Sequence, residues 1–177
     1  MKVFTRISFI LLMAACGCSL GGGDYALPSD LCGIGITPDP LRSILPQGGG
    51  IEQEKIDPDT TEPIVYSCRV RIDQDIAMAI TVRVYDPTGF DLMESYRAAP
   101  SAYNIGSPYE DVIGGEYAIL DSGGSLVQTS CPVKKDVDVL EINVRNHAAS
   151  SESEEGRERM KDFTAAFMDS AKEEFGC

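Results

Sequence analysis

The stretch IAMAITVRVY, residues 76–85, shows the clearest alternation of side-chain character in the chain. One set of alternate positions holds only large aliphatic side chains: Ile76, Met78, Ile80, Val82 and Val84. Side chains of a strand point alternately to its two faces, so this pattern predicts a β-strand with one buried face. The sequence DPTG at residues 86–89 predicts a turn after it. Residues 64–72 form another β-prone run, and the two runs are predicted to pair as a hairpin.

The C-terminal segment has a helical period instead. Apolar side chains recur there at intervals of three and four residues: Met160, Phe163, Phe167, Ala171 and Phe175. This spacing predicts an amphipathic helix whose apolar face packs on the core, and Gly176 is a natural C-cap for it. Before this helix, Leu140, Ile142 and Val144 alternate with polar residues, which predicts a half-buried strand.

Four shorter segments complete the predicted fold. Residues 38–45 and 90–98 are expected to be helical, and residues 117–120 and 125–131 are expected to form a second hairpin. Antiparallel hairpins together with these helices indicate an α+β fold, in which an antiparallel sheet of five or more strands is covered by helices. The segment 27–177 has the length of a single domain with one core.

The predicted domain contains four cysteines, Cys32, Cys68, Cys131 and Cys177, and four cysteines allow three pairings. Cys131 precedes the predicted strand, and Cys177 ends the predicted helix. A nine-residue strand spans roughly 30 Å and an eighteen-residue helix roughly 27 Å, so a helix running back along the strand returns Cys177 to Cys131. This geometry leaves Cys32 for Cys68. Two bridges indicate an exported protein, because disulfides persist in oxidising compartments.

The N-terminus has the pattern of an export signal. Residues 1–15 combine a basic start, an apolar run and two small residues, and the apolar run is too short to span a bilayer. The sequence MAAC that ends at Cys16 resembles a lipoprotein cleavage site, so Cys16 is the predicted acceptor of the lipid. Cys18 is the alternative acceptor. Residues 16–26 would then form a flexible lipidated tether, which places the domain on the extracytoplasmic face of the cell membrane.

The charge of the chain restricts its partners. The formal net charge is −13, and removing the signal, with Lys2 and Arg6, makes it −15. A strongly acidic domain with scattered basic residues does not fit nucleic acid, whose binding depends on clustered lysine and arginine. Anionic lipid would be repelled as well, so the acyl chains are the predicted attachment to the membrane.

Short cysteine-anchored segments carry a family resemblance. They are DLCG at residues 30–33, YSCR at 66–69, GEYA at 115–118 and the closing EFGC at 174–177. Together they resemble an uncharacterised family of small actinobacterial cell-surface lipoproteins. The resemblance implies a two-disulfide domain with the same Cys32–Cys68 and Cys131–Cys177 bridges. One departure is Arg69, which stands where that family often has an aromatic residue.

The sequence contains no motif that indicates catalysis or metal binding. His147 is the only histidine, and the chain has no C-x-x-C, nucleophile elbow or phosphate loop. Residues 57–62, DPDTTE, contain several oxygen ligands but lack the glycine of a calcium loop, so an acidic surface loop is the better interpretation. We therefore predict no catalytic residue, no metal site and no cofactor.

Tyrosines between the strands are the remaining candidates for binding. Tyr96, Tyr103 and Tyr109 lie in a region rich in glycine and proline, where they either pack over the sheet or line a ligand groove. Packing is the favoured interpretation, and the groove is the alternative.

Two functions remain compatible with the sequence. The favoured one is a non-catalytic binding or accessory module at the cell surface, with an unknown extracellular partner or cell-wall ligand. The alternative is an extracellular hydrolase of cell-wall polymer that uses two carboxylates.

Overall fold

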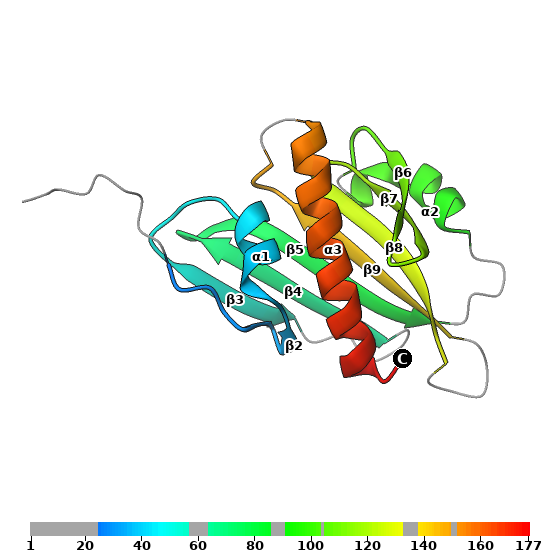
Figure 1. Cartoon of the computed structure of the whole chain (residues 1–177), viewed down its shortest axis with the longest axis horizontal. Helices are drawn as coiled ribbons and strands as arrows, with labels where there is room; N and C mark the ends of the chain where they lie inside the picture. The colour runs from blue at the N-terminus through cyan, green and yellow to red at the C-terminus, as the bar shows by residue number, and fades with distance from the viewer. Residues whose placement is uncertain (1–24, 57–63, 86–90, 104, 133–137, 150–151) are drawn as a thin grey trace, which may run out of the picture.

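The computed structural model describes residues 25–56, 64–85, 91–103, 105–132, 138–149 and 152–177. Within these residues, seven antiparallel strands form one sheet (Figure 1). In spatial order they are β3 (Ile51–Ile56), β4 (Ile64–Ile72), β5 (Asp75–Tyr85), β9 (Asp138–Asn146), β8 (Gly124–Cys131), β7 (Glu116–Leu120) and β6 (Tyr109–Ile113). The sheet confirms the predicted antiparallel α+β class, with more strands than the minimum of five.

The hairpin of β4 and β5 lies where the alternating sequence predicts it. Cys68 is directly opposite Ile80, and the register shifts by a bulge after Val70. The turn between the strands has Asp73 and Gln74 at φ 51° and 78°. Two positive φ values in succession match the twist of a tight hairpin, and an aspartate tolerates this backbone better than most residues. The Asp73 carboxylate also accepts a hydrogen bond from the backbone N–H of Gly49 at 2.9 Å.

The long helix α3 (Glu154–Phe175) covers one face of the sheet, as predicted. It begins at Ser153, whose side chain accepts a hydrogen bond from the Gly156 N–H, and it ends at Gly176 with φ 74°. These are the two cap geometries that polar and glycine residues favour. Its fully buried Phe163 and Phe167 stack with their ring centroids 6.0 Å apart and form the middle of the core.

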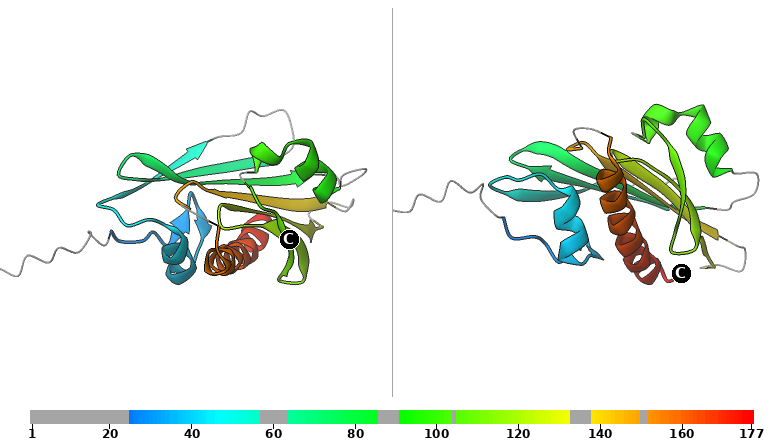
Figure 2. Two further views of the ribbon diagram at one scale, coloured as in Figure 1. Left: turned by 90° about the horizontal axis from the view of Figure 1, so that it is seen from above. Right: turned by 45° about the horizontal axis from the view of Figure 1, so that its top comes forward.

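A second, smaller layer lies beside α3 on the same face of the sheet. It contains α1 (Pro38–Ile44) and a two-stranded sheet of β1 (Asp30–Leu31) and β2 (Ile34–Gly35). Figure 2 shows α1 and α3 together under the sheet and α2 above it. The predicted helix at residues 38–45 is thus present, one residue shorter.

The opposite face of the sheet is covered only in part. There α2 (Leu92–Ala98) and the 3-10 turn η1 (Pro100–Ala102) pack over β7 and β8 (Figure 2). Their contact with the sheet is an apolar cluster of Leu92, Tyr96, Tyr103, Ile105, Ile119 and Leu126. Among the described residues, no helix covers this side of β3, β4, β5 and β9, so the helices cover less of the sheet than predicted.

Both disulfides have the predicted pairing. Cys32 bonds Cys68 and Cys131 bonds Cys177, with Cα atoms 5.9 and 4.4 Å apart. The first bridge fastens the β1–β2 hairpin to the sheet. The second fastens the end of α3 to the end of β8, which is the consequence of a helix returning along a strand.

Candidate binding site on the open face of the sheet

The open face is the side of β3, β4, β5 and β9 that points away from α3. Its side chains alternate with core residues such as Cys68, Ile80 and Ile142, which pack toward the helix. The members that concern us are Ser67, Arg69, Ala79, Thr81, Arg83, Tyr85, Glu141, Asn143 and Arg145. Most of them are polar, although several are half-buried or buried. The open face is therefore a polar surface on which several side chains are held by their neighbours.

Glu141 on β9 is the most buried charge of this surface, with only 1% of its surface exposed. Directly opposite it on β5, Arg83 donates a hydrogen bond from Nη1 to Glu141 Oε1 at 3.0 Å. The Tyr85 hydroxyl donates to Glu141 Oε2 at 3.1 Å, and the Gln128 amide bonds the same hydroxyl. A buried carboxylate is costly unless it is paired and hydrogen-bonded, and Glu141 has both kinds of partner.

Tyr85 stays a neutral donor in this network. Its burial raises the pKa of the phenol strongly, and the neighbouring Glu141 charge raises that pKa further. The phenol and the Arg83 guanidinium therefore hold the carboxylate from two sides. The Glu141 carboxylate is thus held in a fixed position at the edge of the open face, next to the layer of α2 and η1.

Arg69 and Arg71 extend the charge onto β4. They share Glu54 of β3, at 3.8 and 3.5 Å, and half of the Glu54 side chain is exposed. Contacts this long and this exposed contribute little energy. Glu52 is a further exposed acid on β3, directly opposite Arg71. Arg71 also donates from Nη1 to the Gln74 carbonyl at 3.0 Å, but the charges of the two arginines are only loosely compensated.

Arg145 on β9 has no such contact with a carboxylate of a described residue. Its Nε atom is buried and has no hydrogen-bond partner. No ion pair joins its guanidinium to a described acid, although Arg83, a neighbour on the same face, has Glu141. A donor buried without a partner costs free energy, so the Arg145 Nε–H is a group that the described part of the fold leaves unsatisfied.

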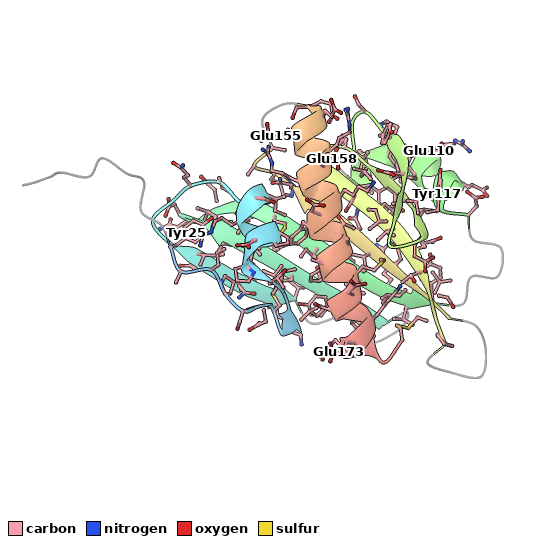
Figure 3. All side chains as sticks on the ribbon, in the orientation of Figure 1. Tyr25, Glu110, Tyr117, Glu155, Glu158 and Glu173 are labelled. Carbon is pink, nitrogen blue, oxygen red and sulfur yellow. A yellow bond between two sulfur atoms is a disulfide. The ribbon has the colours of Figure 1, made fainter. Side chains whose placement is uncertain are left out.

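The cations of the open face are all arginines. The three described lysines are engaged elsewhere: Lys55 over the Tyr66 ring, Lys161 with Asp111, and Lys172 with Glu116. The prominent acids of α3 lie on the other side of the molecule, where Figure 3 labels Glu155, Glu158 and Glu173. The sheet therefore gathers basic residues that the sequence analysis treats as scattered. Its alternation marks them as outward-pointing but does not show that their strands are neighbours.

Among the described carboxylates, Asp111 and Glu152 do not have the raised pKa of a general acid. The hydrogen bond from Lys161 lowers the pKa of Asp111. Burial acts to raise the pKa of Glu152, but hydrogen bonds from Ser122 and Arg157 lower it overall. Asp121, which is buried, accepts backbone N–H bonds from Gly106 and Gly124 and so orders two loops. A general acid instead needs a raised pKa.

A polar pocket of about 210 Å³ lies beside the start of α3. Its lining includes Ser122, Asn146, Ser153 and Arg159. These groups have structural partners: Ser122 Oγ donates to the Ser153 carbonyl at 3.1 Å, and Asn146 Nδ2 donates to the Ile44 carbonyl at 3.2 Å. Arg159 pairs with an acid one turn earlier. The polar groups that line the pocket therefore already form hydrogen bonds or ion pairs within the protein, and these contacts help to hold α3 against the sheet.

The three candidate tyrosines do not line one groove. Tyr96 and Tyr103 are buried together, with ring centroids 6.2 Å apart, and the Tyr96 hydroxyl donates to the Ile105 carbonyl. Tyr109 is 53% exposed and lies on the α3 side of the sheet, where the Arg157 guanidinium stands 5.5 Å from its ring centroid. The first two tyrosines have the packing role that the sequence analysis favours, and the third is separated from them by the sheet.

The other candidates of the sequence analysis do not form sites. His147 is exposed, and its pKa is lowered by partial burial and by the charge of Arg145. Within the described ranges, no three histidine, cysteine or acidic side chains gather as metal ligands. The acidic loop 57–62 and the lipid-attachment candidates Cys16 and Cys18 lie outside the described residues. Of the helices that are described, none is long and apolar enough to cross a membrane.

Comparison with known proteins identifies no relative: no family model matches the chain, and neither a curated protein nor a solved structure is significantly similar to it. The resemblance to actinobacterial lipoproteins rests on four short segments and stays a prediction. The fold and the open face define a class only, an α+β domain with two disulfides and an arginine-bearing sheet surface. The function must be argued from that surface.

Proposed function

We propose that this protein is a lipid-anchored binding module of the extracytoplasmic membrane face, and that it contacts its partner with the open face of the sheet. The observation that carries the proposal is the unsatisfied and loosely paired arginine cluster on a sheet face that no described helix covers. An arginine fork is suited to recognising planar or tetrahedral oxyanions.

The extracytoplasmic location is supported by independent features. Both bridges staple distant parts of the domain, and bridges of this kind are typical of exported proteins. The signal-like residues 1–15 and the cysteine that follows them supply the means of anchoring. The acyl chains would attach the protein, and the open face would remain available to a partner.

Binding is favoured over hydrolysis by the state of the carboxylates. Glu141 is neutralised by Arg83, Asp121 is saturated by backbone donors, and the shifted pKa values of Asp111 and Glu152 are both lowered. A carboxylate pair for glycoside hydrolysis needs one member with a raised pKa. The carboxylates in the described part of the chain thus favour the non-catalytic alternative.

Site-specific photo-cross-linking on intact cells tests the binding face. A photoreactive residue in place of Thr81, at the middle of the open face, is expected to give a covalent adduct with a partner. The matched control replaces Asp162, an exposed residue of α3, and is expected to give none. Equal adducts from both positions, or none from Thr81, would contradict the proposal.

The anchor has its own test. Incorporation of labelled fatty acid should disappear in Cys16→Ser, or in Cys18→Ser if the alternative acceptor is used. Label that persists in the chain with both substitutions would rule out the lipid anchor, while leaving the binding face to be judged by the cross-linking experiment.

A further inference from the structure

One row of side chains crosses the open face at Ala79. In this row Arg145 of β9, Ala79 of β5, Arg69 of β4 and Glu54 of β3 are consecutive register partners. Neighbouring strands are about 4.8 Å apart, so the Cα atoms of the two arginines are about 10 Å apart. Ala79 is only 5% exposed, so its methyl group forms a covered floor between the two long cationic side chains.

The adjacent row adds neutral hydrogen-bonding groups. Thr81 is opposite Asn143 on one side and opposite Ser67 on the other. Asn143 is nearly buried, and its Nδ2 donates to the Ser125 carbonyl at 3.2 Å, which fixes the amide in place. The hydroxyls of Thr81 and Ser67 are half-exposed and lie next to the alanine floor. They are donors that a ligand above Ala79 can reach.

The charge of the two arginines is available for a ligand. The Arg145 side chain has no hydrogen bond or ion pair with a described residue, and its Nε atom is shielded from water. Arg69 has only a 3.8 Å contact with a half-exposed carboxylate that it shares with Arg71. A fold that keeps a buried guanidinium Nε–H without a partner bears a cost, and an external oxyanion would remove that cost.

We propose that Arg69 and Arg145 bind one phosphate group of an extracellular ligand above Ala79. This inference rests on the proposed function and names the chemistry that the open face recognises. Two arginine forks and the neighbouring hydroxyls offer more donors than the two oxygens of a carboxylate can accept in one plane. A phosphate group has more oxygens, arranged tetrahedrally, and matches donors that approach from two sides.

The test is a titration of the full chain in non-ionic detergent, followed by the NMR resonances of the arginine Nε–H groups. Inorganic phosphate is expected to shift the Arg69 and Arg145 resonances with saturation. Arg42, on α1 at the other side of the sheet, should stay unchanged. Potassium chloride at the same ionic strength separates site binding from screening. Absence of a saturable shift, or an equal shift with chloride, would overturn the site.

Paired variants connect the response to the two side chains. In R69Q/R145Q the phosphate response should be lost, because both forks are removed. In R69K/R145K the charge remains but the forks do not, so affinity should fall at least about fivefold. The control R42Q should bind as the unaltered chain does. An undiminished response in R69Q/R145Q would overturn the assignment. The glutamine variants are expected to fold, since the Arg69 side chain is 43% exposed and the Arg145 Nε–H has no partner among the described residues to lose.

Two phosphate compounds distinguish the source of the ligand. A saturable response to glycerophosphoglycerol supports a phosphodiester, as in a lipid head group or a wall polymer. A response to glycerol phosphate alone supports a small soluble monoester. Photo-cross-linking at Thr81 does not depend on the ligand's charge. An adduct without any phosphate response would therefore overturn the phosphate site and leave the binding function standing. A phosphate response without an adduct would leave the phosphate site standing and overturn the proposed binding of a partner.

Discussion

Arg83 and Glu141 lie directly opposite each other on β5 and β9, and the guanidinium donates to a carboxylate that is 99% buried, at 3.0 Å. The two partners differ in exposure, because 43% of the Arg83 side chain is accessible and 1% of the Glu141 side chain is. The pair thus joins the protein interior to the open face. It holds a charged residue in place beside the layer of α2 and η1.

Replacing Arg83 by Met should destabilise the fold by about 1–3 kcal/mol, since Glu141 would keep its burial and lose its charged partner. The exposure of Arg83 lets water replace part of the interaction, which keeps the loss below that of a fully buried pair. Urea unfolding measures the change. The control Arg42→Met, at an exposed position of α1, should stay within about 0.5 kcal/mol. A loss no larger than that of the control would show that Glu141 does not depend on Arg83.

Removing the C-terminal bridge by replacing Cys131 and Cys177 with Ser should cost about 3–4 kcal/mol, because this bridge closes a loop with a sequence separation of 46. Reductant should destabilise the unaltered chain more than this variant, which has one bridge left to lose. Thermal unfolding with and without reductant gives both comparisons. Equal melting temperatures for the two oxidised chains would mean that the bridge does not stabilise the fold.

Replacing Phe167 by Ala should lower the free energy of unfolding by about 3–5 kcal/mol. The Phe167 ring points from α3 into the core, where it is fully buried and stacks on Phe163. Glu158→Ala, on the exposed side of the same helix, controls for changes in the helix itself (Figure 3). Chemical denaturation of the two variants measures the difference. A loss below roughly 1 kcal/mol for Phe167→Ala would place this helix face outside the core.

The Asp111–Lys161 pair should make stability depend on acid. The hydrogen bond from Lys161 at 2.8 Å lowers the pKa of Asp111 below its ordinary value of 3.8 in the folded protein. The unfolded state then binds more protons between the two pKa values. The pair therefore stabilises the fold fully above about pH 4 and loses this effect as the pH falls through the folded pKa.

Asp111→Asn should therefore have a smaller difference in melting temperature between pH 7 and pH 3 than the unaltered chain. Asp162→Asn, which removes an exposed acid of α3, is the matched control and should leave the difference largely unchanged. If both variants behave alike, the pKa of Asp111 is not lowered by folding.

The sequence predicts the interior strands well because their periodicity is strong. In residues 64–72 and 76–85, mostly buried apolar side chains alternate with more polar ones, and that contrast is visible in the residues alone. The exceptions are Ile76, which is 38% exposed, and Ala77 and Ala79, which are buried on the other side. The bridge from Cys131 to Cys177 is also predictable, because strand and helix lengths fix where the chain returns. These features depend on local pattern and element length.

The edge strands and the binding site are not predictable in the same way. β3 has four exposed residues in succession, Glu52–Lys55, and β6 is mostly exposed, so neither shows a clear alternation. The arginine cluster depends on which strands are neighbours, since β9 inserts between β5 and β8 from far along the chain. Alternation indicates that Arg145 points outward. Only the strand order places it two strands from Arg69.

The most direct test of a binding function on the open face is the yield of the Thr81 cross-link on intact cells when the arginines are altered. We predict that R69Q/R145Q lowers the adduct yield about tenfold, which corresponds to about 1.4 kcal/mol of binding free energy. The charge-matched control R42Q/R159Q, altered on the other side of the sheet, should retain the full yield. An undiminished adduct in R69Q/R145Q, or an equal loss in the control, would contradict the assignment of binding to this face.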